Sequence, residues 1–76
     1  MTHQSMWGAV DNVAQMMGLS RSGLAKACGL DPTTFNQSKR WTRVGKPRWL
    51  STATLAKVME VAQITDLEFY NLQPKE

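Results

Sequence analysis

The 76-residue chain contains a single cysteine and a single histidine, too few for a disulfide framework or a four-ligand zinc site. It has no run of about 18 apolar residues, so the sequence predicts no transmembrane helix. The first five residues lack a basic cluster followed by an apolar stretch, and we therefore expect no secretory signal. These absences predict a cytoplasmic protein that uses no metal, no cofactor and no membrane.

The chain is also too short for a second core, and we expect residues 1–76 to form one domain. No serine–histidine–acid set, cysteine–histidine pair or carboxylate pair can be brought together on so small a core, so we expect no enzymatic activity. Cys28 is predicted to be a small buried apolar residue, and Trp7 to lie in the core. His3 falls in a terminus that we expect to be frayed.

Acidic residues are scarce in the middle of the sequence, where Asp31 is the only one between Ser20 and Leu50. That stretch holds seven basic residues and has a net charge of +6, whereas two basic and five acidic residues give the remainder −3. The seven are Arg21, Lys26, Lys39, Arg40, Arg43, Lys46 and Arg48. Such a segment is either an unevenly charged surface or a face that binds a polyanion, of which nucleic acid is the commonest.

Helical spacing and capping residues divide the chain into about five short helices without a strand-like stretch. Apolar residues three and four apart predict a helix over residues 6–17 that stops at Gly18. A fourth helix begins after Ser51, and the capping box Thr65-x-x-Glu68 opens the fifth.

Between them, two helices follow one another closely. Ser20 is a good N-cap for a helix over residues 21–28, which Gly29 ends. Asp31-Pro32 then opens a further helix through residue 38. A connection this short makes the two helices cross steeply, and we predict a compact all-α bundle.

A basic, aromatic loop over residues 39–50 follows, in which Gly45 and Pro47 argue against a continuous helix. Loops of this length in small domains are usually functional or disordered, and two tryptophans favour function. Trp49 is predicted to pack on the body of the protein. Trp41 either packs there or lies against a sugar-phosphate backbone.

The segment Arg21–Arg40 resembles the helix-turn-helix of lambda-repressor-like transcription regulators. Ala25 is small where the two helices approach, and Gly29 occupies the turn. The core is expected to contain Leu24, Ala25, Leu30, Phe35, Leu55 and Val58. With the downstream Lys39-Arg40 and Pro47-Arg48-Trp49, the chain resembles phage-repressor-like regulators whose longer members carry a C-terminal self-cleaving serine peptidase domain. The sequence has no counterpart of that domain, so it is either a fragment or a short regulator.

The resemblance implies a transcriptional repressor that binds double-stranded DNA with the helix at 32–38 in the major groove. Four polar residues of that helix would contact bases: Thr33, Thr34, Asn36 and Gln37. Gln37 would pair with adenine on the same helix face as Thr33. Thr34 could instead meet a phosphate, and Thr33 and Thr34 could also serve only to satisfy the helix end. Seven further residues would contact phosphate: Ser20, Arg21, Lys39, Arg40, Arg43, Lys46 and Arg48.

The implied partner is a palindromic operator, on which a monomer or weak homodimer would pair as a dimer. The main alternative is a protein-interaction module that docks an acidic partner through the basic loop. A binder of single-stranded nucleic acid or of RNA comes third, because the aromatic residues are few and the sequence shows no stacking platform.

Overall fold

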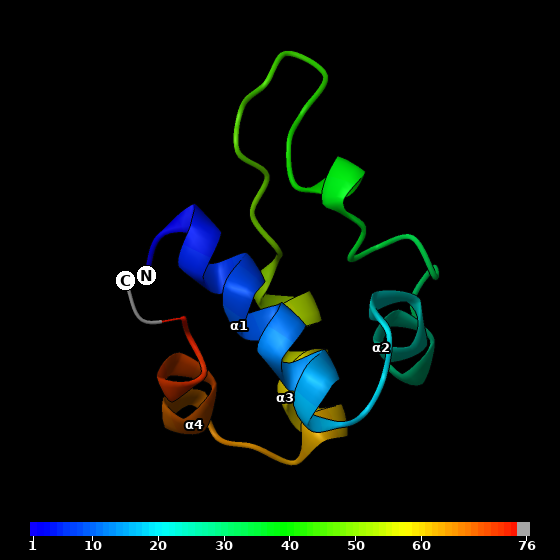
Figure 1. The fold of residues 1–76 in the computed structure, drawn as a ribbon, viewed down its shortest axis with the longest axis vertical. Helices are drawn as coiled ribbons and strands as arrows, with labels where there is room; N and C mark the ends of the chain where they lie inside the picture. Colours follow the sequence, from blue (N-terminus) through cyan, green and yellow to red (C-terminus); the bar gives the residue numbers. More distant parts are fainter. Residues whose placement is uncertain (75–76) are drawn as a thin grey trace.

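The computed structural model describes residues 1–74, which form four α-helices and one short 3₁₀ helix with no β-strand (Figure 1). The helices are α1 (His3–Met16), α2 (Arg21–Ala27), η1 (Gln37–Lys39), α3 (Thr52–Ala62) and α4 (Asp66–Asn71). The long helix α1 contacts α2, α3 and α4, so it is the element around which the others pack. The prediction of an all-α protein is confirmed.

Local capping signals set the helix boundaries. Ser20, Ser51 and Thr65 cap α2, α3 and α4 as predicted, each accepting a hydrogen bond from the amide three residues later. Helix α1 begins three residues earlier than predicted, because Thr2 and Ser5 form a reciprocal capping box. Gly18 ends α1 with a φ of +69°, a conformation that costs other residues free energy.

The core lies between α1 and the other helices. Its largest fully buried side chains are Met6, Val10, Val13, Leu24, Phe35 and Val58, with Trp7, Ala25 and Phe69 also buried in the same cluster. The predicted burial of Trp7, Leu24, Ala25, Phe35 and Val58 is confirmed, whereas Leu30 and Leu55 are only partly buried. Cys28 is buried as predicted, and this burial raises the pKa of its thiol.

The prediction of a helix over residues 32–38 is wrong. Residues 32–35 form a turn held by bonds between residues three apart, and Asn36 is extended before η1 begins. Asp31 starts this turn by accepting bonds from the Thr33 amide and hydroxyl, while the Thr34 hydroxyl donates to the Asp31 carbonyl. These side chains compete with helical hydrogen bonding, and threonine and asparagine are poor helix formers. We call residues 31–36 the polar turn.

None of the helices in the described part of the chain is both long and apolar enough to cross a bilayer. The four α-helices range from 14 residues in α1 to 6 in α4.

Substituting Ala25 tests the close packing of α2. Ala25 is 0% exposed, so Ala25→Leu should lower the free energy of unfolding by about 1–3 kcal/mol through overpacking. Ala27→Leu is the matched control, because Ala27 is exposed on the same helix. Urea unfolding measures both variants, and equal stability of Ala25→Leu and Ala27→Leu would contradict the packing described.

Candidate nucleic-acid interface

Four exposed basic residues lie in η1 and in the loop that follows it, which stand at one end of the ribbon in Figure 1: Lys39, Arg43, Lys46 and Arg48. None of them forms an ion pair with any residue in 1–74. Three exposed acids, Glu60, Asp66 and Glu68, lie on α4 and the end of α3, at the opposite end in Figure 1. The basic and acidic residues, which are separated along the sequence, are therefore also separated in space, across a molecule 35 Å long.

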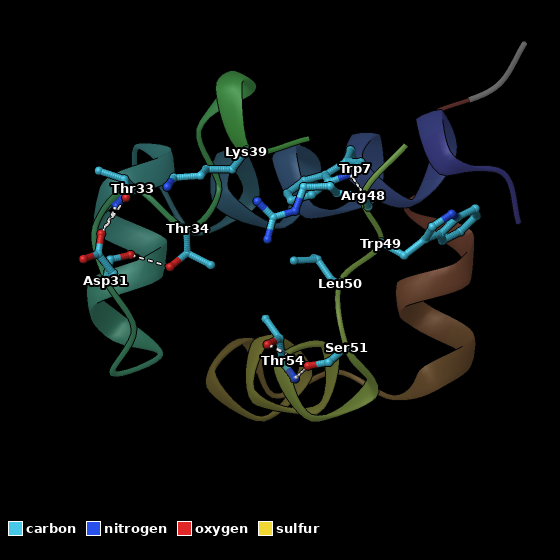
Figure 2. Close-up of a pocket in the computed structure, with 10 residues that line it drawn as sticks. All are labelled: Trp7, Asp31, Thr33, Thr34, Lys39, Arg48, Trp49, Leu50, Ser51 and Thr54. Carbon is cyan, nitrogen blue, oxygen red and sulfur yellow. Dashed lines mark hydrogen bonds between the residues drawn. The ribbon is translucent and has the colours of Figure 1, made fainter. Parts of the chain in front are cut away.

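Two of these cations open onto a groove of about 540 Å³ between the polar turn and the start of α3. In Figure 2 the Lys39 side chain points toward Thr33, and that of Arg48 toward the middle of the groove. The groove is otherwise rich in hydroxyl groups, contributed by Thr33, Thr34, Ser51 and Thr54. The predicted residues Thr33, Thr34, Lys39 and Arg48 thus come together at one place.

The groove also receives the N-terminus of α3, an 11-residue helix. Ser51 caps it by accepting from the Thr54 amide at 3.1 Å, and the remaining first-turn amides and the helix dipole favour a negatively charged ligand there. Asp31 lies at the groove as well, but its carboxylate is engaged by Thr33. The hydrogen bonds from Thr33 lower the pKa of Asp31, so this carboxylate stays ionised at neutral pH.

Gln37 opens onto a different hollow of about 510 Å³, which it shares with His3, Trp7 and Trp41. The prediction that Gln37 and Thr33 lie on one helix face is therefore wrong, because the helix that would align them does not form. Gln37 is nevertheless exposed, at the first position of η1. Asn36 just before it is half-buried.

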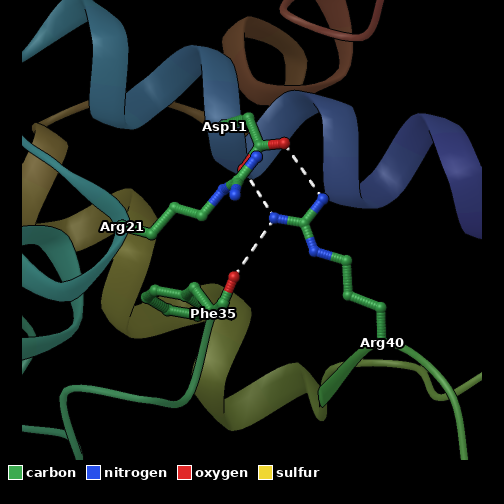
Figure 3. A network of polar contacts seen from close by, with 4 residues as sticks. All are labelled: Asp11, Arg21, Phe35 and Arg40. Carbon is green, nitrogen blue, oxygen red and sulfur yellow. Dashed lines mark hydrogen bonds and ion pairs between the residues drawn. The ribbon is translucent and has the colours of Figure 1, made fainter. Parts of the chain in front are cut away.

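The structure does not present Arg40 to a phosphate. The Arg40 side chain is 8% exposed, and its guanidinium donates two hydrogen bonds to Asp11, at 2.7 and 3.0 Å (Figure 3). A third bond goes to the Phe35 carbonyl at 3.1 Å, and the guanidinium carbon lies 4.7 Å from the centre of the Trp7 ring. Arg40 therefore joins the polar turn to α1, and its assignment as a phosphate contact is corrected.

Arg21 and Ser20 also have structural partners. Arg21 donates to the same Asp11 carboxylate at 3.1 Å, with its side chain 42% exposed. Burial raises the pKa of Asp11, but the hydrogen bonds and charges of Arg40 and Arg21 outweigh burial and hold that pKa below 3.8. The Ser20 hydroxyl is occupied in capping α2. Both residues remain partly accessible at the start of that helix.

Residues 40–48 form a short hairpin, which we call the basic hairpin. An isolated antiparallel bridge pairs Trp41 with Pro47, and the Thr42 amide donates to the Lys46 carbonyl at 2.8 Å. The Gly45 amide donates to the Thr42 carbonyl at 2.9 Å, with Gly45 at a φ of +82° that closes the turn. The predicted loop is thus not helical, but it is ordered by its own hydrogen bonds.

Both ends of the basic hairpin are attached to α1. The His3 Nε2–H donates to the Arg40 carbonyl at 2.8 Å, and the Trp7 indole donates to the Arg48 carbonyl at 3.0 Å. The Arg40 carbonyl also accepts from the Arg48 amide at 2.9 Å, which joins the two strands of the hairpin at its base. His3 is therefore in a helix and a structural contact, contrary to the prediction of a frayed end.

The His3 ring also lies among three tryptophans. Its centroid is 4.7 Å from Trp41, 5.8 Å from Trp49 and 6.5 Å from Trp7. Trp41 and Trp49 pack on His3 with one side and are about half exposed, so the packing predicted for Trp49 is incomplete. The sequence does not reveal His3 and Trp7 as supports of the hairpin, because their partners lie 37 and 41 residues away and no local pattern signals such contacts.

Among residues 1–74, no group of three or more histidine, cysteine, aspartate or glutamate side chains is placed to hold a metal ion. Comparison with known proteins gives no match to a family, to a curated protein or to a solved structure. The assignment of a function therefore depends on the geometry and charge of the surface described above.

Proposed function

We propose that this chain is a sequence-specific double-stranded DNA-binding protein that acts as a transcriptional repressor, in which the polar turn and η1 take the place that the second helix of a helix-turn-helix would have. The observation that carries the proposal is the set of exposed, unpaired cations around the groove: within the described chain, Lys39 and Arg48 line it and have no acidic partner. Phosphate contacts of this kind supply most of the affinity of proteins for DNA.

In this proposal one phosphate of the DNA backbone occupies the groove. Lys39 and Arg48 would provide the charge, the Thr54 hydroxyl a neutral donor, and the N-terminus of α3 a favourable dipole. Lys46 on the basic hairpin is exposed and would contact a further phosphate. These contacts would fix the position of the protein on the duplex without reading its sequence.

Base reading would then come from the polar turn and η1. The major groove is about 12 Å wide and accepts a compact protein element as well as a helix. Thr33 and Gln37 are exposed polar side chains of this element, and Gln37 can form a bidentate pair with adenine. We propose further that two copies meet on a palindromic operator, since one head of this size contacts few base pairs.

Selection of bound duplexes from a random pool tests the proposed function. The wild-type chain should enrich a short site, present twice in inverted orientation about one helical turn apart. Enrichment of no sequence, despite binding that weakens with salt, would contradict sequence-specific recognition. Failure to bind any duplex would refute DNA binding and would favour the alternative function, in which the basic loop docks an acidic protein partner.

Gln37 gives a prediction that separates specificity from affinity. Gln37→Ala should abolish the preference at one base pair per half-site, a discrimination of about 1–3 kcal/mol, while binding to random DNA changes little because the net charge is unchanged. Gln15→Ala removes the same side chain from an exposed position on α1 and serves as the control. The two variants are compared by site selection, and identical sites for both would show that Gln37 reads no base.

A further inference from the structure

The end of the basic hairpin combines an exposed apolar side chain with neighbouring positive charges. Val44 is 77% exposed, the highest value among the large apolar side chains of residues 1–74. It lies between Arg43 and Gly45, and Lys46 follows on the returning strand. An exposed valine flanked by cations, with no acid among residues 32–59, forms a surface that suits an anionic partner with partly apolar walls.

The hairpin is also rigid enough to present that surface. The Gly45 amide closes the turn, and a hydrogen bond between Thr42 and Lys46 joins the two strands. At the base of the hairpin, His3 and Trp7 donate hydrogen bonds to its two ends. Figure 1 shows it projecting from the helices at one end of the molecule. Two residues on each side separate Val44 from the Trp41–Pro47 bridge, and Val44 lies inside the turn that the bond from the Gly45 amide to the Thr42 carbonyl closes.

The shape and charge of the hairpin end suit the minor groove of B-DNA. That groove is about 6 Å wide and 7.5 Å deep, so a single side chain at the end of a hairpin can enter it while a whole helix does not fit. Its negative potential is greatest where it is narrow, in runs of A·T pairs, and attracts arginine. Its walls are deoxyribose, against which an apolar side chain packs.

We propose that the end of the basic hairpin, residues 43–46, enters the minor groove beside the major groove contacted by the polar turn. Arg43 occupies the groove, Val44 packs on a deoxyribose wall, and Lys46 binds the phosphate at its edge. In this arrangement Arg43 favours A·T pairs. This role differs from the one that the sequence predicts for Arg43, which is a phosphate contact independent of the base sequence. This inference rests on the proposed function, since it requires that the chain bind duplex DNA.

Inosine separates the two grooves experimentally. An inosine·cytosine pair presents the minor groove of an A·T pair, because it lacks the guanine amino group, but the major groove of a G·C pair. The selected site is therefore prepared with flanking pairs that are A·T, G·C or inosine·cytosine. The wild-type chain should bind the A·T and inosine·cytosine flanks alike, and at least about fivefold more tightly than the G·C flanks.

Arg43→Lys keeps the charge but replaces the guanidinium by a more strongly hydrated ammonium. It should bind the G·C-flanked duplex within about twofold of wild type and lose the preference for the other two flanks. Equal binding of the three duplexes by the wild type, or a preference that survives in Arg43→Lys, would overturn the inference while leaving DNA binding intact. Absence of binding to any of the three duplexes would instead refute the proposed function.

Discussion

Replacing Asp11 by alanine is expected to lower the free energy of unfolding by about 3 kcal/mol. The substitution leaves the Arg40 side chain, which is 8% exposed, without the one carboxylate that it contacts among residues 1–74. Breaking a buried ion pair on one side costs about 3–5 kcal/mol. The lower value applies because the Asp11 side chain is 30% exposed. A 76-residue domain has a total stability of roughly 4–11 kcal/mol, so the loss is a large part of it. Urea unfolding followed by tryptophan fluorescence measures this.

The double variant Asp11→Ala/Arg40→Met is the control for this result. It removes both charges, together with the Arg40 Nε, which is buried and has no hydrogen-bond partner in residues 1–74. Replacing a buried pair by apolar groups is often close to neutral, so the double variant should recover most of the stability that Asp11→Ala loses. A single variant as stable as wild type, or a double variant less stable than the single one, would contradict the role given to Arg40.

The same carboxylate makes stability depend on pH in a defined direction. The pKa of Asp11 is lowered in the folded state, so the unfolded chain binds a proton at a higher pH than the folded chain does. The contribution of Asp11 is therefore complete above its ordinary pKa of 3.8 and disappears as pH falls through the lower folded value. In Asp11→Ala, the free energy of unfolding should therefore fall less steeply as the pH is lowered below 3.8 than it does in the wild type.

Removing the two cations of the groove is expected to weaken DNA binding about 60-fold. Each cation that no longer neutralises a phosphate reduces the slope of log K against log salt by about 0.9, which corresponds to about eightfold at 0.1 M salt. Lys39→Ala/Arg48→Ala should therefore reduce that slope by nearly two, on selected and random duplexes alike. Fluorescence anisotropy at several salt concentrations gives both quantities.

A matched variant, Lys26→Ala/Lys57→Ala, makes the same change of net charge outside the groove. Lys26 and Lys57 are both exposed, in the last turn of α2 and on α3 beside the end of α2. This variant should bind within a few-fold of wild type and keep nearly the full salt slope. Equal losses in the two double variants would show that net charge alone, and not the groove, determines the affinity.

Much of the helical framework could be predicted because its determinants are local. Ser20, Ser51 and Thr65 are capping residues followed by helical spacing of apolar positions, and each begins a helix where predicted. Burial of Leu24 and Phe35 also followed from spacing. These features depend on residues within a few positions of one another, which is the range that a sequence pattern describes.

Two wrong predictions, for Arg40 and for the helix after Asp31, have different physical causes: a long-range contact and competition from side-chain hydrogen bonds. In the sequence Arg40 is one more cation of a basic segment, but Asp11, 29 residues earlier, neutralises it inside the protein. The pattern Asp31-Pro32 predicts a helix cap, yet the hydroxyls of Thr33 and Thr34 hold Asp31 in a turn. Composition therefore identified the basic surface, while only the fold shows which of its charges remain available.

The most direct measurement of the central claim is a salt titration of binding to a selected duplex and to a random duplex of equal length. We expect log K to fall linearly with log salt for both, and the selected duplex to bind at least about 1,000-fold more tightly at physiological salt. Equal affinity for the two duplexes at every salt concentration would contradict sequence-specific DNA recognition.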